Sequence, residues 1–316
     1  MKFLLKKTAW DFVRWSYPAM ALSLLLMLGS AGSLMVKGLN LGIDFSGGIL
    51  IQLRFPGPAP VKEIRHELSG MTLGDVVIQE FGTPDEVLIR VEQQTDARRD
   101  VSQLSDEVVK RLTPLAGDQG IELRRVEVVG PQVGQELTQQ GILAVLYSLV
   151  AILIYVAWRF EFRFALGAVL ALVHDVTITM GYFSLFEREF TLVVVAALLT
   201  VIGYSLNDTI VVYDRIRDEV KRMKRQPMAA IINEAVNQTL SRTLVTSLTV
   251  LIVLVALLIF GGEVIHDFAL TLFLGVVVGT YSSVYVASPV VLLMNRNPRT
   301  APSPREDTVA EGETDD

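Results

Sequence analysis

Long apolar runs separated by short polar connections dominate the chain. A helix needs ~20 residues to cross ~30 Å of hydrocarbon, and six runs reach that length. They cover residues 15–36, 138–158, 164–186, 190–212, 243–262 and 268–294. Backbone groups in lipid must be hydrogen-bonded internally, so each run is predicted to be a transmembrane helix. We interpret the first run as an uncleaved helix rather than a signal peptide, because a signal peptide has only ~7–15 apolar residues.

Between the first two runs the pattern changes to the alternation that is typical of strands and short amphipathic helices. Gly82-Thr83-Pro84-Asp85 predicts a turn within this region. The predicted order is βαββαβ, as in ferredoxin-like folds, which host many functions and therefore do not name one. The predicted strands cover 49–57, 75–81, 86–91 and 121–129, and the predicted helices cover 60–68 and 100–112.

Lysine and arginine are distributed unevenly between alternate connections. Residues 1–14 hold four of them and residues 213–242 hold seven, whereas 261–267 holds none. Connections rich in these residues usually face the cytoplasm. Both termini are therefore predicted to be cytoplasmic, and residues 37–137 are predicted to form an external domain.

The same pattern predicts four regions along the chain. Because the tail is acidic and rich in proline, we expect it to be disordered. The regions are the N-terminus with the first helix (1–36), the external domain (37–137), the other five helices with a cytoplasmic loop at 213–242 (138–295), and the tail (296–316).

Composition narrows the possible functions. The 316 residues are 51% hydrophobic and include no cysteine, which excludes disulfides, thiolate catalysis and cysteine-based zinc sites. The external domain contains no P-loop, HExxH motif or Ser/His/Asp grouping, and the whole chain lacks GxxxxGK(S/T). We therefore expect no enzymatic activity, no cofactor, no bound metal and no nucleic-acid partner.

Asp208 is the ionisable residue that demands most explanation. It lies about four residues inside the predicted cytoplasmic end of the fourth run, where a carboxylate is costly unless it is protonated, paired or hydrated. Such residues usually mark a proton or ion pathway, although a hydrogen-bonding role that orients helices is the alternative. Arg242 would lie at a matching depth on the antiparallel fifth helix, either as a partner of Asp208 or as a flank that reaches the lipid headgroups.

Further polar and small side chains follow helical spacing. Thr239, Arg242, Thr246 and Thr249 are predicted to form one polar stripe. Ser205 and Asn207 lie on the same predicted helix as Asp208. We predict that these hydroxyl and amide groups hold a chain of water or hydroxyls that delivers the proton.

Two other groups lie within the predicted helices. His174 and Asp175 are adjacent, so they should point ~100° apart and not toward one place. One would line the polar interior and the other would bond a neighbouring helix, and no second ligand at suitable spacing supports a metal. Small residues recur at every fourth position of the last run and predict a face for close helix packing; they are Gly275, Gly279, Ser283 and Ala287.

Several motifs in combination resemble the SecD/SecF family of the bacterial protein-export machinery. The first includes Gly42, Asp44, Phe45, Gly47 and Gly48, directly after the first helix. The resemblance covers about residues 1–295, and the single modest external domain and the IGYSLNDT motif resemble the SecF branch. The motifs are LGIDFSGG (41–48), VGPQVGQEL (129–137), VHDV (173–176), IGYSLNDT (202–209), YDRIR (213–217) and LSRT (240–243).

The resemblance implies an α-helical multi-pass, RND-like membrane protein with an inserted α+β ferredoxin-like domain. It implies the bacterial inner membrane, with residues 37–137 in the periplasm. The implied partners are SecD, the SecY–SecE–SecG channel, the accessory protein YajC, unfolded preproteins and protons. With SecD, such a protein would use the proton motive force to help complete preprotein translocation.

The resemblance also assigns roles to individual residues. Asp208 and Arg242 match the family's proton-coupling positions, and we group Asn207 and Asp175 with them. We expect release of an Asp208–Arg242 pair to shift the fourth and fifth helices against the last one, and the first helix to carry this motion outward through residues 42–48. An RND-type exporter of small molecules or lipids and a non-transporting scaffold are the alternatives, and a scaffold would not need Asp208.

Overall fold

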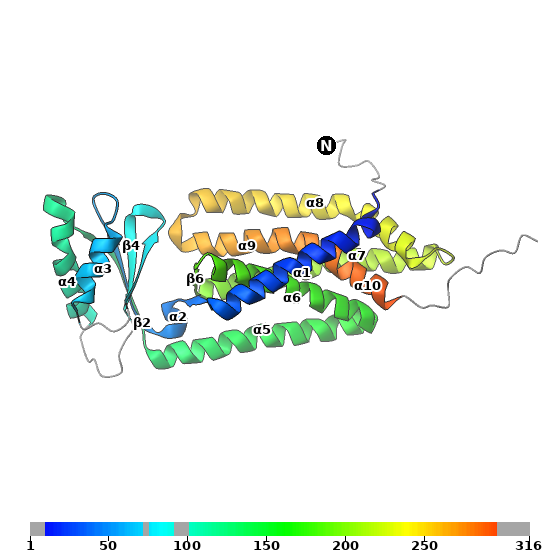
Figure 1. The fold of residues 1–316 in the computed structure, drawn as a ribbon. Helices are drawn as coiled ribbons and strands as arrows, with labels where there is room; N and C mark the ends of the chain where they lie inside the picture. Colours follow the sequence, from blue (N-terminus) through cyan, green and yellow to red (C-terminus); the bar gives the residue numbers. More distant parts are fainter. Residues whose placement is uncertain (1–9, 72–75, 92–100, 296–316) are drawn as a thin grey trace, which may run out of the picture.

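The computed structural model describes residues 10–71, 76–91 and 101–295. A bundle of long helices and a small domain built around a sheet lie end to end (Figure 1). Six described segments are long and apolar enough to cross a membrane. The predicted fold class is therefore confirmed. The segments are α1 (Phe12–Val36), α5 (Pro131–Arg159), α6 (Phe162–Leu185), α7 (Leu192–Arg222), α8 (Met228–Phe260) and a last span, Ile265–Met294, made of α9 (Gly262–Ser282), the π-helical turn η2 (Ser283–Ala287) and α10 (Ser288–Met294).

Helix ends differ from the limits of the apolar runs, most clearly between the fourth and fifth spans. The predicted loop at 213–242 is largely helical, because α7 continues to Arg222 and α8 begins at Met228. The buried Glu219 helps to hold this extension, since Arg215 Nη2 and Arg222 Nε each lie 2.7 Å from one of its oxygens. Hydropathy therefore indicates which residues lipid can accept, whereas charged side chains that bond one another extend the helix further.

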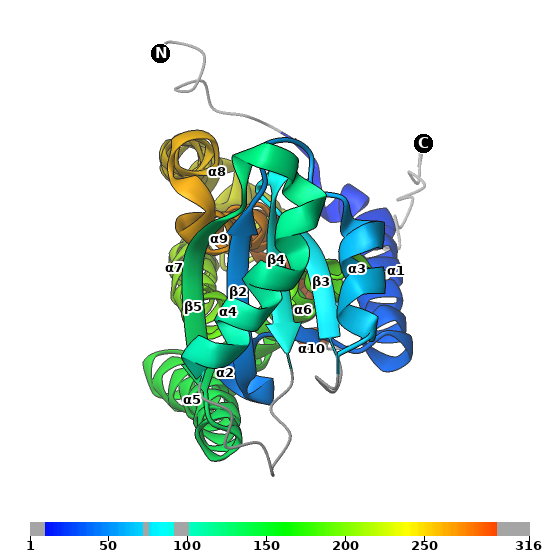
Figure 2. The same cartoon turned by 90° about the vertical axis from the view of Figure 1, so that its left-hand side faces the viewer.

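The sheet domain consists of four strands and two helices in the predicted βαββαβ order. Its antiparallel strands lie in the order β3-β4-β2-β5, and α4 lies farthest from the membrane helices (Figure 1). Its core forms where Ile51, Leu53 and Ile89 of the sheet meet Ile64 of α3 and Val108 of α4. The elements are β2 (Gly48–Arg54), α3 (Val61–Ser69), β3 (Val76–Phe81), β4 (Thr83–Val91), α4 (Val101–Leu112), the 3₁₀ helix η1 (Thr113–Gln119) and β5 (Glu122–Val129); Figure 2 shows the sheet with both helices in front of it.

The β3–β4 connection is tighter than the predicted four-residue turn. Gly82 alone links the strands at φ +64°, and Phe81 already pairs with Thr83. Pro84 and Asp85 belong to β4, where their carbonyls accept backbone hydrogen bonds of 2.7 Å from outside the hairpin. A left-handed glycine can turn the chain without further residues, so the turn prediction was too long.

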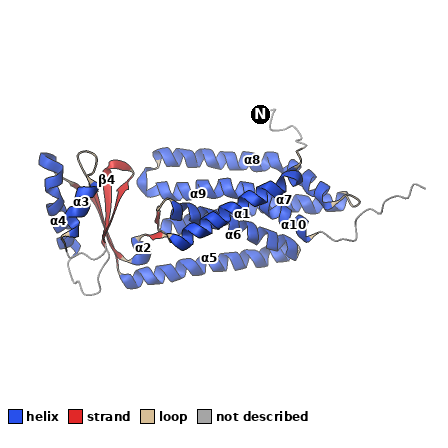
Figure 3. Cartoon of the chain, viewed as in Figure 1, coloured by secondary structure: helices blue, strands red, loops and turns tan. Residues whose placement is uncertain are grey.

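Three short elements at the junction between the bundle and the sheet domain were not predicted. β1 (Asn40–Leu41) pairs in parallel with β6 (Glu189–Phe190), and α2 (Ile43–Ser46) follows β1 as a single turn. The four longer strands lie in the sheet domain, next to this junction (Figure 3). Elements of two to four residues are too short to show periodicity, and β1 and β6 become neighbours only when the bundle has formed.

Candidate functional site

Close packing of α7 against α9 shapes the centre of the bundle. A Cβ on Gly275 would lie 2.1 Å from Cγ2 of Val201, and one on Gly279 would lie 2.9 Å from Cβ of Ser205. The small residues of the last span therefore allow α9 to approach α7 where larger side chains would collide. This approach brings polar groups of α6, α7 and α9 together.

Asp175 of α6 is the centre of a buried polar cluster; it is 0% exposed, and both of its carboxyl oxygens are hydrogen-bonded. Its Oδ2 accepts hydrogen bonds from Ser205 Oγ at 2.5 Å and Ser282 Oγ at 2.9 Å. Its Oδ1 lies 2.9 Å from Nδ1 of His174. The prediction that His174 and Asp175 point to different places is therefore wrong, because side-chain rotation brings their polar atoms together although their Cα–Cβ bonds diverge.

His174 extends this cluster toward α1. Its ring stacks on Tyr281 at a centroid distance of 6.3 Å. Tyr281 Oη donates to the carbonyl of Ala19 at 2.7 Å and accepts from Ser23 Oγ at 3.1 Å. The cluster thus joins α1, α6, α7 and α9.

Asp208 of α7 lies in a second and less complete cluster. It is 2% exposed, and its Oδ2 has no hydrogen-bond partner among the described residues. Ser247 of α8 lies beside the carboxyl group, and Arg242 attracts it as a nearby charge although the Arg242 side chain is exposed. The structure therefore holds Asp208 buried, with one oxygen unbonded and its predicted partner nearby.

A chain of hydroxyl groups continues from Ser247 across three helices. Tyr204 Oη of α7 donates to Ser247 Oγ at 3.3 Å, and Ser247 Oγ lies 2.7 Å from Thr280 Oγ1 of α9. Thr243, one turn before Ser247, is buried and its hydroxyl has no partner among the described residues. The sequence analysis identified Asp208 but did not identify these four hydroxyl residues as its neighbours. Isolated hydroxyl residues at the depth of an intramembrane carboxylate could have indicated them.

The polar stripe on α8 shares Thr239 with the predicted one and otherwise differs from it. The buried face carries Thr239, Thr243 and Ser247. Thr246 and Thr249 are exposed, and their hydroxyls donate to carbonyls of their own helix. Spacings of three and four residues both fit a helix, so two interleaved sets of hydroxyls were possible, and packing against α7 and α9 selected the other one.

Asn207 points away from both clusters. It is exposed on α7 and continues a surface of small and polar residues at Ala196, Thr200 and Gly203, all exposed. The structure thus brings Ser205 and Asp175 together and places Asp208 near Arg242. It does not bring Asn207 or Thr249 to either cluster, whereas Thr246 lies beside Tyr204 at the edge of the second one.

Residues 42–48, which carry the first motif described above, lie at the junction between the bundle and the sheet domain. Gly47 and Gly48 have φ values of +71° and +122°, which side chains disfavour. A Cβ on Gly47 would lie 2.9 Å from Cα of Pro131, the first residue of α5. Gly42 donates its amide to the carbonyl of Phe190, 2.9 Å away. The glycines therefore allow this segment to fit against the ends of α5 and α7.

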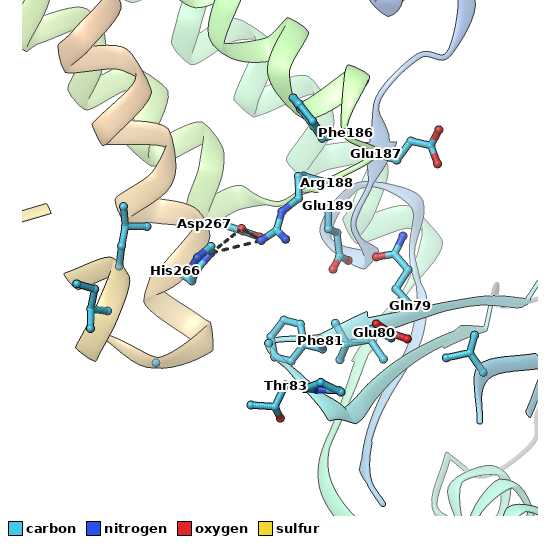
Figure 4. A pocket seen from close by; sticks show the side chains of 17 residues that line it. Gln79, Glu80, Phe81, Thr83, Phe186, Glu187, Arg188, Glu189, His266 and Asp267 are labelled. Atoms are coloured by element: carbon cyan, nitrogen blue, oxygen red, sulfur yellow. Dashed lines mark hydrogen bonds and ion pairs between the residues drawn. The ribbon is translucent and has the colours of Figure 1, made fainter. Parts of the chain in front are cut away.

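A cleft of about 900 Å³ lies between the β3–β4 hairpin and the nearby ends of the membrane helices (Figure 4). Arg188 donates to Asp267 across one wall, and Phe81 and Phe186 contribute apolar surface. Burial raises the pKa of the Glu189 carboxyl, and the nearby carboxylates of Asp267, Asp44 and Glu127 raise it further, while Arg90 opposes them. The cleft separates the two parts of the molecule on one side of the junction.

Comparison with known proteins gives consistent matches. The family models "SecD/SecF GG Motif" and "Protein export membrane protein SecD/SecF, C-terminal" match residues 32–55 and 109–297. A protein translocase subunit SecF of Magnetococcus marinus is 62% identical over 95% of this chain and 96% of its own length. The SecF of Vibrio alginolyticus is 48% identical over 89% of this chain and 88% of its own length.

Solved structures match as well. The crystal structure of SecDF, a translocon-associated membrane protein from Thermus thermophilus, has a TM-score of 0.82 and 39% identity over 93% of this chain. SecDF in its super-membrane-facing form has a TM-score of 0.68 and 40% identity over 92% of this chain. The chain spans 40% and 39% of the lengths of these two SecDF chains.

Proposed function

The chain belongs to the SecD/SecF family of protein-export membrane proteins, and from this premise we propose that it acts with SecD to use the proton motive force for preprotein export. It is a multi-pass membrane subunit of the protein translocase and a transport component rather than an enzyme. Its contribution would be to help complete translocation across the inner membrane.

The observation that carries the proton-driven step is the incompletely bonded carboxyl of Asp208. A carboxylate buried without full hydrogen bonding is unstable as an ion, whereas an approaching guanidinium stabilises the ion. Because Oδ2 has no partner within the described part of the chain and Arg242 lies nearby, a modest helix movement can exchange a protonated Asp208 for a charged one paired with Arg242. One charge crossing the membrane supplies ~2.3 kcal/mol per 100 mV, enough to bias two states that differ by a few kcal/mol.

The hydroxyl groups beside Asp208 are suited to deliver the proton. Ser247, Tyr204 and Thr280 form a hydrogen-bonded series that begins next to the carboxyl group. We assign this role to the series, with Thr246 beside Tyr204 at its edge, in place of Asn207 and Thr249. Asp175, with both oxygens bonded, would hold α6, α7 and α9 in register rather than carry the proton.

The test of this function is export driven by a proton gradient in inverted membrane vesicles. Asp208→Asn should abolish the stimulation of export by the gradient and leave ATP-driven export intact, since the amide cannot ionise. Asp214→Asn is the matched control, because Asp214 lies on the same helix but is half-exposed in an ion pair with Arg159. Full stimulation by Asp208→Asn would leave the scaffold alternative standing.

The proposed orientation places both termini in the cytoplasm and residues 37–137 in the periplasm. It is supported by the lysine and arginine residues at the bundle ends away from the sheet domain. A reporter that is active only outside the cytoplasm should be active when fused after Val91 and silent after Lys224. The reverse pattern would place the sheet domain on the wrong side for receiving exported chains.

The proposed direct partner is SecD. The matched SecDF chains are more than twice the length of this one, which leaves room for a second set of helices. The exposed amide of Asn207 would be costly against lipid, so the surface formed by Ala196, Thr200, Gly203 and Asn207 suits contact with another polar helix. Copurification from native membranes should recover SecD, and we expect SecY, SecE, SecG, YajC and unfolded preproteins as further partners of the assembly.

A further inference from the structure

We propose that Asp44 is a positioning residue that couples the sheet domain to α7, the helix that carries Asp208. Its carboxyl Oδ2 accepts a hydrogen bond of 2.9 Å from the backbone amide of Leu192, the first residue of α7. The inference rests on the proposed function, because it concerns how a change at Asp208 reaches the sheet domain. It assigns a role to the acidic residue of the segment 42–48.

The start of α7 lacks the usual local cap. Thr191 occupies the N-cap position but makes no side-chain capping hydrogen bond, and the first turn contains no acidic residue. Helix N-termini have unpaired amides and a partial positive charge. Asp44 supplies the missing acceptor from 148 positions earlier in the sequence, so α7 is capped by a different part of the chain.

Neighbouring contacts hold Asp44 and α7 together as one unit. The ring of Phe45 stacks on Phe190 with centroids 5.8 Å apart. β1 pairs with β6 on the same side of the junction, and the Gly42 amide donates to the carbonyl of Phe190. The segments before α2 and before α7 are thus joined by backbone bonds, ring contact and the Asp44 cap.

On its other side, Asp44 is connected almost directly to the sheet domain. α2 ends at Ser46 and β2 begins at Gly48, and β2 lies between β4 and β5 inside the sheet. Leu192 and Asp208 are separated by about 24 Å of continuous helix, at ~1.5 Å per residue. A tilt or shift of α7 caused at Asp208 would therefore reach β2 through Asp44, by a shorter route than the one predicted through α1.

A variant with a local cap separates coupling from simple helix stabilisation. Asp44→Ala removes both the cap and the connection. Adding Thr191→Asp restores a cap from within α7, since the N-cap backbone is extended there and aspartate is a favoured N-cap, but it does not restore the connection. Thr191→Asp alone is the matched control, because it adds the local cap while Asp44 remains.

The measurement uses the full chain with SecD in proteoliposomes. The chain has no native cysteine, so Thr83→Cys on the hairpin and Ile259→Cys on α8 can carry spin labels across the cleft, where both residues are exposed. The label distance is recorded with and without a pH gradient, together with the unfolding temperature and the gradient-stimulated export. We expect Asp44→Ala to lower the unfolding temperature by about 2–4 °C and to lose the gradient-dependent distance change.

The double variant, Asp44→Ala with Thr191→Asp, is the decisive test of the proposal. It serves this purpose even if Asp44→Ala alone is too unstable to study. We expect it to recover the unfolding temperature but neither the distance change nor the stimulated export. Recovery of all three would reduce Asp44 to a helix cap and overturn the proposal, as would a distance change that persists in Asp44→Ala or is missing in the parent. A failure of the proposed function appears separately, as normal stimulated export by Asp208→Asn whatever the Asp44 variants do.

Discussion

Two buried carboxylates on neighbouring helices have opposite surroundings. Asp175 is fully buried, and its oxygens are bonded by His174 on one side and by Ser205 and Ser282 on the other. Asp208 is almost as buried, yet its Oδ2 has no hydrogen-bond partner among the described residues. An aspartate side chain is thus held by hydrogen bonds on both oxygens at position 175 and is incompletely bonded at position 208.

This difference shows that burial alone does not identify a proton carrier. A change of charge on Asp175 would disturb three partners at once, because both of its oxygens are hydrogen-bonded. A change of charge on Asp208 disturbs fewer partners and has a cation within electrostatic reach. The hydrogen bonds therefore favour Asp208 as the proton carrier and Asp175 as a fixed centre of the bundle.

The largest effect on stability is expected for Asp175→Ala. The change removes the acceptor for Ser205 and Ser282 and the partner of His174, and each buried polar group left unbonded costs about 1–3 kcal/mol. We expect a loss of at least roughly 3 kcal/mol in the free energy of unfolding, measured by denaturant titration in detergent. An Asp175→Ala protein as stable as the parent would show that these bonds do not hold the bundle together.

The amide variants at the two positions should separate stability from function. Asp175→Asn should cost about 1–2 kcal/mol, because the amide retains only one acceptor oxygen, while the folded fraction keeps gradient-stimulated export. Asp208→Asn should change stability by less than about 1 kcal/mol and lose the stimulation. Both the free energy of unfolding and gradient-stimulated export in vesicles are measured on the two variants. Loss of stimulation in Asp175→Asn together with normal stimulation in Asp208→Asn would contradict the roles assigned to the two aspartates.

A smaller effect is expected for Ser247→Ala. The hydroxyl bonds Tyr204 and Thr280 beside Asp208, so its loss should cost about 1 kcal/mol and reduce gradient-stimulated export. Thr249→Ala is the control, because the Thr249 hydroxyl is exposed and bonds only its own helix. Equal export by the two variants would remove the hydroxyl series from the proton path.

The smallest effect concerns Glu189, a third carboxylate that lies outside the membrane helices. Its pKa is raised above the ordinary value of 4.5, first by burial and then by Asp267, Asp44 and Glu127. The Glu189 carboxyl therefore binds a proton more tightly in the folded state than in the unfolded state. Burial of its charge lowers the free energy of unfolding at pH values above the raised pKa, and this loss of stability is relieved as the pH falls toward 4.5.

The Glu189→Gln variant tests the direction of this pH dependence of stability. The parent should become more stable relative to the variant as the pH is lowered through that window, and the variant should be the more stable of the two at neutral pH. Unfolding temperatures of both proteins across the pH range give the difference directly, because other carboxylates titrate alike in both. A difference that grows with rising pH in favour of the parent would show that Glu189 is stabilised as an ion.

The sequence by itself determined the features that depend on local composition. Runs of apolar residues must be helical in lipid, so the six spans followed from hydropathy, and alternation between residues 48 and 129 indicated the order of the sheet domain. Motifs identified the family, and Asp208 stood out because a carboxylate in an apolar run is costly. None of these inferences required knowing which segments become neighbours.

The tertiary structure alone decided which polar groups meet. Helical spacing allowed either Thr246 and Thr249 or Thr243 and Ser247 to face inward, and the packing of α7 and α9 selected the second pair. The Asp44 cap joins positions 148 residues apart, and no local pattern specifies such a contact. Side-chain partners across helices depend on rotation and depth, which are fixed only when small residues such as Gly279 let the helices close to contact.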